Sequence, residues 1–333
     1  MHVLYVSNSR GVHDDRWISA MRTSGCTVTP LRIDPADGGA LSTVERLVGD
    51  LGIDVVVAGP LTTCTRALAS VSVPLVGLSW GFDLHQIAGT EQHPDSSWMT
   101  TLAGLIVDSE STRTIAENFG VESDRIELIP WGVDLEVFHP DGGRATHPGL
   151  PSSARVVLSA RAHEPLYRVG DIVAAFENGR NTWDDDVYLV VVNDGPLTSG
   201  LQAGAGDHTL FIGRVAEEDL AAWFRRSDVY VSASETDGSS VTLLQAMACG
   251  APVLISDIPG NREWIRDGEN GRLFPLGDID ALTAALAEVL ANTEDLAGTA
   301  QALTEVRARA DWSRNSPRLC ALLRRISELP PDE

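Results

Sequence analysis

The sequence predicts an α/β protein of two doubly wound domains, each a parallel sheet flanked by helices. Short runs of β-branched residues alternate with longer amphipathic segments, which is the pattern typical of βαβ units. This alternation occurs twice, and a Pro- and Gly-rich stretch without periodicity, residues 138–151, separates the two halves. A chain of 333 residues is also long enough for two domains. We therefore expect two domains facing each other across a cleft, with ligands at the carboxyl ends of their strands.

The individual elements follow from the same alternation. The first half contains candidate strands near residues 2–6, 27–32, 54–57, 74–78, 104–107 and 126–129, with helices between them. The second half contains candidate strands near residues 155–159, 187–192, 208–212, 228–231 and 252–255, and candidate helices near residues 168–177, 217–226, 241–248 and 279–292. We expect an N-terminal domain over residues 1–145, a C-terminal domain over residues 150–311, and a C-terminal helix within residues 312–333 that packs back on the N-terminal domain.

The charge balance excludes several classes of function. The formal net charge is −22, and all 25 basic residues are arginine, because the sequence contains no lysine. A lysine Schiff base, a Walker-type phosphate loop and a lysine general base are therefore excluded. An acidic chain without clustered basic residues is also unsuited to nucleic acid and to anionic membranes. Any bound anion must be held by arginine, histidine, hydroxyl groups, backbone N–H groups or a metal.

The cysteine pattern indicates a reducing compartment. Cys26, Cys64, Cys249 and Cys320 are scattered singly, without the paired spacing of metal ligands, so we expect reduced thiols in a cytoplasmic protein. The chain starts directly with a strand-like run, residues 2–6, and we expect neither a signal peptide nor a membrane span. No metal-ligand cluster stands out in the sequence, and we expect no bound metal.

The loop before the candidate helix 241–248 carries most chemical information. Gly238 allows a close backbone approach, and the pair Ser239–Ser240 is placed to cap the helix, whose free N–H groups would stabilise an anion. Asp237 and Gln245 are eight residues apart, so one lies in the loop and the other about two turns into the helix. Both could contact one extended ligand, but an ordinary capped turn with a helix-surface glutamine explains the same pattern.

Several ordered motifs carry a resemblance to a known family. These motifs are Ser232–Val253, Ile258–Phe274, Phe211–Val215, Ile129–Asp134, Phe138–Pro140, Val107–Ser111 and His13–Trp17. Together they resemble the retaining GT-B glycosyltransferases of family 4, the glycosyl transferases group 1, over nearly the whole chain. The resemblance implies a GT-B architecture of two Rossmann-like domains. It also implies transfer of a sugar from a nucleotide-diphosphate sugar, of UDP or GDP type, to a small-molecule or glycan acceptor, with retention and without a required cofactor or metal.

Two other interpretations stay open beside this one. The first is a nucleotide-sugar epimerase, or an enzyme that couples cyclitols, on the same fold. The second is a catalytically weak partner protein that binds a nucleotide sugar. The second is suggested by Gln245, which stands where the family has a carboxylate.

The resemblance also implies roles for single residues. Asp237 and Gln245 stand where the family has two glutamates, of which the first holds donor-sugar hydroxyls and the second holds the ribose. Arg161 matches the family arginine that clamps the donor diphosphate. Because the family's lysine is missing, Arg168 is the candidate for the second cation, although it could instead solvate a helix start. The implied nucleotide-binding residues are Gly11, Val215, Gly238, Ser239, Ser240, Val241 and Gln245.

Three polar residues of the first half are candidates for the acceptor side. Arg16 could hold a phosphate or lie on a helix surface. Asp83 could face the cleft or cap its loop, and His85 could face the cleft or be an ordinary surface histidine. The glutamates of polar loops that we expect to be solvated are Glu235, Glu263 and Glu269.

Overall fold

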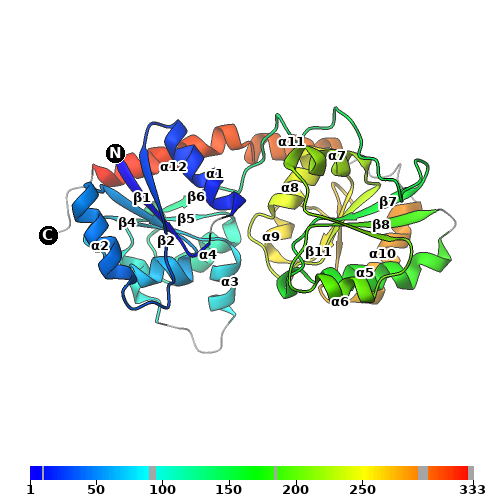
Figure 1. Ribbon diagram of the computed structural model, residues 1–333, viewed down its shortest axis with the longest axis horizontal. Helices are drawn as coiled ribbons and strands as arrows, with labels where there is room; N and C mark the ends of the chain where they lie inside the picture. Colours follow the sequence, from blue (N-terminus) through cyan, green and yellow to red (C-terminus); the bar gives the residue numbers. More distant parts are fainter. Residues whose placement is uncertain (10, 90–94, 184–185, 292–298, 329–333) are drawn as a thin grey trace. The chain divides into compact units, whose positions relative to one another are not determined.

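The computed structural model describes residues 1–9, 11–89, 95–183, 186–291 and 299–328, and the chain divides into two units. Unit 1 comprises Met1–Trp131 and Trp312–Glu333, and unit 2 comprises Gly132–Asp311. Each unit is a six-stranded parallel sheet with helices on both faces, which confirms the predicted α/β class (Figure 1). Among the described helices, none is long and apolar enough to cross a membrane.

Unit 1 begins with β1, in which every residue after His2 is buried. Its described helices and strands are β1 (His2–Ser7), α1 (Val12–Thr23), β2 (Thr27–Arg32), α2 (Ala40–Leu51), β3 (Val55–Ala58), β4 (Leu75–Leu78), α3 (Phe82–Ala88), β5 (Gly104–Val107), α4 (Glu110–Asn118), β6 (Ile126–Leu128) and α12 (Trp312–Ser327). The strand order is β2-β1-β3-β4-β5-β6. Pro30 has no N–H to donate, and β2 tolerates it because this strand lies at the edge of the sheet.

Unit 2 has the strand order of a dinucleotide-binding fold, β12-β11-β10-β7-β8-β9. Its described helices and strands are β7 (Arg155–Ser159), α5 (Val169–Gly179), β8 (Val187–Val192), α6 (Thr198–Ala203), β9 (Thr209–Gly213), α7 (Glu217–Arg226), β10 (Val229–Ser232), α8 (Val241–Ala248), β11 (Val253–Ser256), α9 (Pro259–Arg262), β12 (Arg272–Phe274), α10 (Ile279–Ala291) and α11 (Thr299–Arg309).

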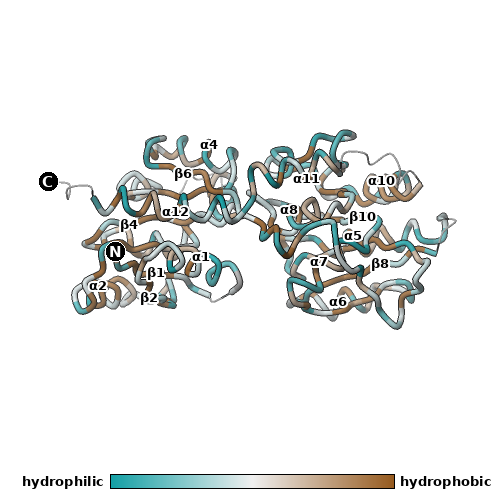
Figure 2. Tube along the Cα trace, turned by 90° about the horizontal axis from the view of Figure 1, so that it is seen from above, coloured by the Kyte–Doolittle hydropathy of each residue, from teal (hydrophilic) through white to brown (hydrophobic). Residues whose placement is uncertain are grey.

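Alternate residues of the unit 2 strands enter two different apolar clusters. Val156 and Leu158 pack in one cluster, and Val157 between them packs in the other. Because a strand points successive side chains to opposite faces, both faces of the sheet are covered. Figure 2 shows the hydrophobic residues running along the strands of each unit. The sequence pattern did not reveal β12, α6 or α11; β12 has only three residues, too few to show an alternation.

The N-terminal segment of unit 1 ends at Trp131, whereas we expected the N-terminal domain to reach residue 145. Residues 132–145 belong to unit 2 because α7 holds them. The Arg225 guanidinium donates to the Gly143 carbonyl at 2.9 Å and to the His139 carbonyl at 3.2 Å. The side chain of Phe138 is buried in the unit 2 core.

Helix α12 packs on α1 within unit 1. The Arg324 guanidinium donates to the Ser24 carbonyl at 3.1 Å, and the Asn315 side-chain amide donates to the Pro130 carbonyl at 3.3 Å. Gly104, at the start of β5, leaves room for the end of α12, because a Cβ atom there would lie 2.7 Å from Cδ1 of Ile326. Residues 329–333, at the end of the expected C-terminal helix segment, lie outside the described residues.

Replacing Gly104 by alanine should destabilise unit 1 by about 1–3 kcal/mol, because the added methyl group overpacks the contact with Ile326. Shortening the neighbour in the double variant Gly104→Ala/Ile326→Val removes the clashing atom and should recover part of this loss. Urea unfolding of the two single variants and the double variant measures the coupling. Strictly additive effects would show that the two positions do not contact.

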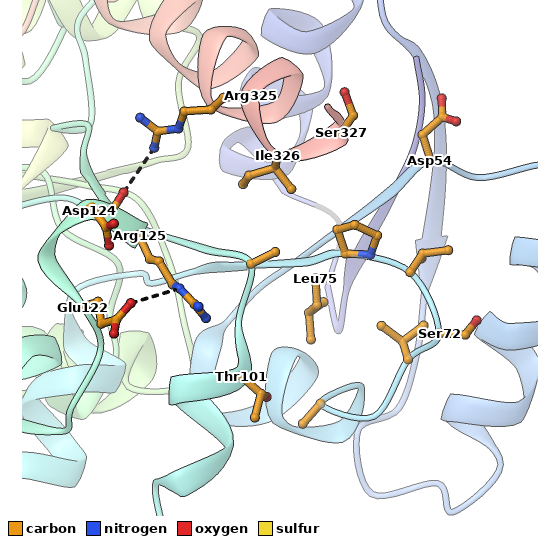
Figure 3. A pocket seen from close by; sticks show the side chains of 15 residues that line it. Asp54, Ser72, Leu75, Thr101, Glu122, Asp124, Arg125, Arg325, Ile326 and Ser327 are labelled. Atoms are coloured by element: carbon orange, nitrogen blue, oxygen red, sulfur yellow. Dashed lines mark hydrogen bonds and ion pairs between the residues drawn. The ribbon is translucent and has the colours of Figure 1, made fainter. Parts of the chain in front are cut away.

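A groove of about 860 Å³ lies next to Ile326, at the amino ends of β3 to β6 (Figure 3). Its arginines bind neighbouring protein groups. Arg325 donates to the Asp124 carbonyl at 3.3 Å. Arg125 donates to the Thr100 carbonyl at 3.2 Å and lies 3.5 Å from Glu122. Both guanidinium groups are therefore engaged within unit 1, and the predicted site residues lie elsewhere.

Candidate functional site

The strand order of unit 2 brings two distant loops together. β7 and β10 are hydrogen-bonded neighbours, and the order of the sheet reverses between them. Ligands of open α/β sheets bind at the carboxyl ends of the strands at such a reversal. The loop after β7 carries Arg161, and the loop after β10 carries Asp237. These two predicted residues are therefore placed side by side by the topology.

Arg161 is buried at this point, with 7% of its surface exposed. Its Nη2 donates to Oδ1 of Asp237 at 2.8 Å, and its Nη1 donates to the hydroxyls of Ser240 at 2.7 Å and Thr242 at 3.0 Å. The guanidinium carbon lies 4.0 Å from the centre of the Tyr167 ring, a cation–π contact. The geometry thus fixes a single, well-oriented cation at the sheet reversal.

The charge of Arg161 is stabilised by its anion. Burial lowers the pKa of Arg161, but the Asp237 carboxylate together with Tyr167 and Tyr230 raises the pKa above its ordinary value. The other oxygen of that carboxylate, Oδ2 of Asp237, is buried and has no hydrogen-bond partner within the described ranges. A buried acceptor without a partner costs free energy. Oδ2 of Asp237 can therefore accept a hydrogen bond from a donor that does not belong to the described protein residues.

A glycine of the neighbouring loop fits tightly against Asp237. Gly260 lies in α9, and a Cβ atom there would lie 2.1 Å from the Asp237 carbonyl oxygen and 2.4 Å from that of Gly238. Both atoms belong to the backbone, so a side chain at position 260 cannot be accommodated by a rotamer change. Gly260 thus sets how closely α9 approaches the loop after β10.

The start of α8 completes the cluster. Ser240 occupies the N-cap position, but among the described groups its side chain makes no capping hydrogen bond, because its hydroxyl faces Arg161. Ser239 and Ser240 are 4% and 3% exposed. Val241 is the first residue of α8, and Gln245, in its second turn, is 5% exposed. Gln245 is therefore not the helix-surface glutamine of the alternative interpretation.

Arg168 also contacts the loop after β10, but it binds different groups from those that Arg161 binds. It has a left-handed backbone conformation, with φ of 45°, at the start of α5. Its guanidinium donates to Asp171 at 2.7 Å and to Glu235 at 2.9 Å, and these hydrogen bonds raise the pKa of Arg168. Glu235 is thus exposed but ion-paired rather than simply solvated; Glu269, also exposed, pairs with Arg266 at 2.9 Å.

Two predicted nucleotide-binding residues belong to other parts of the fold than the loops after β7 and β10. Val215 follows β9, at the edge of the sheet, and packs against the core of unit 2. Gly11 belongs to unit 1, where it precedes α1 beside the sheet reversal between β1 and β3. Its N–H donates to Oδ2 of Asp14 at 2.8 Å, and its backbone is extended, with φ of −137°.

The three candidates for the acceptor side all lie in unit 1. The Arg16 guanidinium lies 4.8 Å from the centre of the Trp312 ring on α12. Nε2 of His85 lies 3.4 Å from the Ser111 hydroxyl. Asp83 is fully buried at the start of α3. The structure therefore distributes these residues over three different local contacts.

The Asp83 carboxylate connects the loops that follow β3 and β4. It accepts hydrogen bonds from the N–H of Leu61 at 2.8 Å, the Ser79 hydroxyl at 2.7 Å and the N–H of Leu84 at 2.9 Å, and the Trp80 N–H lies 3.2 Å from both oxygens. Of the two roles considered for Asp83, this geometry matches loop capping. Burial raises the pKa of Asp83, against the opposing effect of these donors.

This raised pKa predicts a pH dependence of stability. In the unfolded state the carboxyl group of Asp83 has its ordinary pKa of 3.8. In the folded state its pKa is higher, so the group keeps its proton to a higher pH. The stabilisation from this carboxyl group is therefore largest below pH 3.8 and declines as the pH rises through the folded-state pKa. The variant Asp83→Asn does not titrate there. The stability of the wild type relative to this variant, measured by urea unfolding, should fall between acidic and neutral pH; a rise would contradict the direction.

Four residues of the cluster escaped the sequence analysis, namely Tyr167, Tyr230, Thr242 and Gly260. Thr242 follows Ser240 by two residues. Nothing in the sequence near Thr242 indicates that its hydroxyl accepts a hydrogen bond from Arg161 of the loop after β7. The Tyr230 hydroxyl, on β10, donates to Thr242 at 2.8 Å.

No group of three or more His, Cys, Asp or Glu side chains suited to a metal ion occurs among residues 1–9, 11–89, 95–183, 186–291 and 299–328.

Comparisons with known proteins match a large part of the chain. Residues 153–292 match the family described as Glycosyl transferases group 1. The chain is 34% identical over 222 residues to the phosphatidyl-myo-inositol mannosyltransferase of Mycobacterium leprae, covering 65% of this chain and 57% of the relative. It is 29% identical over 211 residues to the D-inositol 3-phosphate glycosyltransferase 2 of Catenulispora acidiphila, covering 59% of this chain and 49% of the relative. The matched part thus spans about half the length of these curated relatives.

Solved structures show the fold. The sucrose-phosphate synthase of Thermosynechococcus elongatus superposes with a TM-score of 0.77 at 17% identity, covering 98% of this chain and 99% of that one. Anabaena Alr3699/HepE in complex with UDP-glucose gives a TM-score of 0.76 at 17% identity, covering 98% and 100%. These structures are GT-B glycosyltransferases. The chain therefore has the GT-B fold, and its residues 153–292 match the family of glycosyl transferases group 1.

Proposed function

We propose that this protein is a retaining glycosyltransferase that moves a sugar from a nucleoside diphosphate sugar to an acceptor hydroxyl. The observation that carries the proposal is the buried Arg161 at the sheet reversal of unit 2, beside the start of α8. A buried guanidinium and free helix N–H groups are suited to a diphosphate. The match of residues 153–292 to the glycosyl transferases group 1 supports the same conclusion.

Each element of the cluster has a defined task in the proposed reaction. Arg161, Ser240 and the first N–H groups of α8 hold the donor diphosphate and stabilise the negative charge that builds as it leaves. Oδ2 of Asp237 accepts a hydroxyl of the donor sugar, and Gln245 binds the ribose. Arg168 serves as the second cation once it turns from Glu235. The acceptor attacks on the face that the diphosphate leaves, with the leaving phosphate taking the proton, so retention needs no protein nucleophile.

The donor is proposed to carry UDP or GDP. A solved structure with the same fold was obtained in complex with UDP-glucose. The acceptor is proposed to be a small soluble polyol, because a net charge of −22 repels anionic surfaces. The relatives include D-inositol 3-phosphate glycosyltransferases and phosphatidyl-myo-inositol mannosyltransferases, so cyclitols are the first acceptors to test. Four buried free cysteines support a cytoplasmic location.

A turnover assay with chemically defined partners tests this proposal. Purified protein is incubated with UDP-glucose, UDP-N-acetylglucosamine, GDP-mannose or UDP-galactose, each with myo-inositol, its phosphates or simple sugars. Release of UDP or GDP that depends on the acceptor is expected, and NMR should show the donor's anomeric configuration in the product. Binding of nucleotide sugars without any turnover, or an inverted product, would contradict the proposal.

A further inference from the structure

We propose that Tyr230 and Thr242 are positioning residues which, through a relay of hydroxyl groups, turn the Ser240 hydroxyl into a hydrogen-bond donor toward an anion at the start of α8. This inference rests on the proposed function, because the anion in question is the diphosphate of the donor. Neither residue needs to touch the substrate. Both act by deciding where the hydroxyl hydrogens point.

The direction of the relay follows from counting donors and acceptors. A hydroxyl group has one hydrogen to donate and two lone pairs that accept. Oγ1 of Thr242 accepts from Nη1 of Arg161 at 3.0 Å and from the Tyr230 hydroxyl at 2.8 Å. Both lone pairs are then used, because a guanidinium can only donate. Thr242 must therefore direct its own hydrogen elsewhere, and Oγ of Ser240 lies 3.4 Å away.

The same count applied to Ser240 gives its orientation. Oγ of Ser240 accepts one hydrogen bond from Nη1 of Arg161 at 2.7 Å. In the relay it accepts a second one from the Thr242 hydroxyl, which lies 3.4 Å away. Its hydrogen consequently points out of the relay. The N-cap position of α8 places this hydroxyl beside the first N–H groups of the helix, which it does not cap. Ser240 thus adds a third kind of donor, next to the guanidinium and the helix N–H groups, at one anion position.

Tyr230 can fill the first position of this relay because it keeps its proton. It is buried inside β10, and burial raises the pKa of its hydroxyl above the ordinary value of 10.0. The hydroxyl therefore remains a donor at neutral pH. Its only task within the relay is to occupy the second lone pair of Thr242. Removing it leaves that lone pair open, so that the Thr242 hydrogen and in turn the Ser240 hydrogen lose their fixed directions.

The test compares how much the phosphates contribute to binding. Calorimetry gives the affinity for UDP and for uridine, or for GDP and guanosine, and the ratio of the two isolates the contribution of the diphosphate. Thr242→Val is expected to reduce the ratio about tenfold, equivalent to about 1.4 kcal/mol. The reason is that the Ser240 hydroxyl is no longer oriented to donate its hydrogen bond to the charged diphosphate. Thr242→Ser should restore the ratio. Tyr230→Phe should reduce it about threefold.

A double variant separates the relay from a direct effect on Arg161. In a Ser240→Ala background, Thr242→Val is expected to cause no further loss, because the hydroxyl through which it acts is gone. A full tenfold loss in that background would overturn the relay and assign the effect to Arg161 alone. The matched control is Thr65→Val, which removes a buried threonine hydroxyl in unit 1 that donates to Ala58 and should leave the ratio unchanged.

The failure of the relay and the failure of the proposed function give different results. Wild-type protein that binds neither UDP nor GDP overturns the proposed function, and the relay with it. Wild-type binding with an unchanged ratio in folded Thr242→Val, checked by thermal unfolding, overturns the relay alone. If Thr242→Val does not fold, Tyr230→Phe, which removes a single oxygen, decides the same question.

Discussion

Replacing Arg161 by alanine is expected to weaken the binding of UDP or GDP by at least about 100-fold, because a charge-assisted contact to a buried anion is worth about 2–5 kcal/mol. The same change should destabilise unit 2 by about 3 kcal/mol. It removes one partner of a buried ion pair, and the Asp237 carboxylate is left without its cation. Calorimetry and urea unfolding measure the two effects separately.

Asp237, the ion-pair partner of Arg161, offers an internal control for the effect on stability. In an Asp237→Asn background there is no carboxylate to leave unpaired, so Arg161→Ala should cost clearly less stability than in the wild type. Arg214→Ala is the matched surface control. Arg214 pairs with Asp194 at 2.7 Å, but its side chain is 75% exposed, and its loss should change stability by at most about 0.5 kcal/mol. An unchanged UDP and GDP affinity in Arg161→Ala would remove Arg161 from the proposed donor site.

Gly260→Ala should damage the site without touching any polar side chain. The added Cβ atom would lie 2.1 Å from the Asp237 carbonyl oxygen, so either α9 or the loop after β10 must move. The free-energy cost of overpacking is at the upper end of its usual range when the contacted atoms belong to the backbone. We therefore expect a loss of about 3 kcal/mol in unfolding free energy. The displaced loop also carries Asp237 away from Arg161, and affinity for UDP or GDP should fall about tenfold or more.

A glycine in open space provides the comparison. Gly200 lies in α6, and a Cβ atom there would meet nothing within 4 Å. Gly200→Ala should be neutral or stabilise the protein by up to about 1 kcal/mol, because alanine favours the helix. Wild-type stability and nucleotide affinity in Gly260→Ala would show that the loop after β10 is freer than its contact with α9 indicates.

The strands were predictable because burial on both faces imposes a pattern that local sequence carries. β1 and β8 are continuous apolar runs, which is what a strand covered by helices on both sides requires. The boundary between the two units at Trp131 was not predictable in this way. Residues 132–145 are held by Arg225 and Phe224 of α7, and such contacts between distant segments leave no local pattern.

The sequence singled out some residues of the candidate site, but it did not show their arrangement. Arg161 and Asp237 each follow a strand, which marks both as residues at the carboxyl edge of a sheet. Their direct bond at 2.8 Å depends on β7 lying beside β10, and only the strand order shows that. Arg168 was singled out as a cation, but its pairing with Glu235 depends on the same folding of two loops toward each other.

The path of the chain has a consequence for the order in which the protein forms during synthesis. Unit 2 is one continuous segment, so all of it has left the ribosome once Asp311 has emerged. Unit 1 begins first but lacks α12, whose buried residues Leu319, Leu323 and Ile326 complete its packing. Domains generally fold as units when their chain is available. The segment that is translated first therefore completes its packing last. A nascent chain from which Asp311 has emerged, but α12 has not, would have a complete unit 2 and an incomplete unit 1.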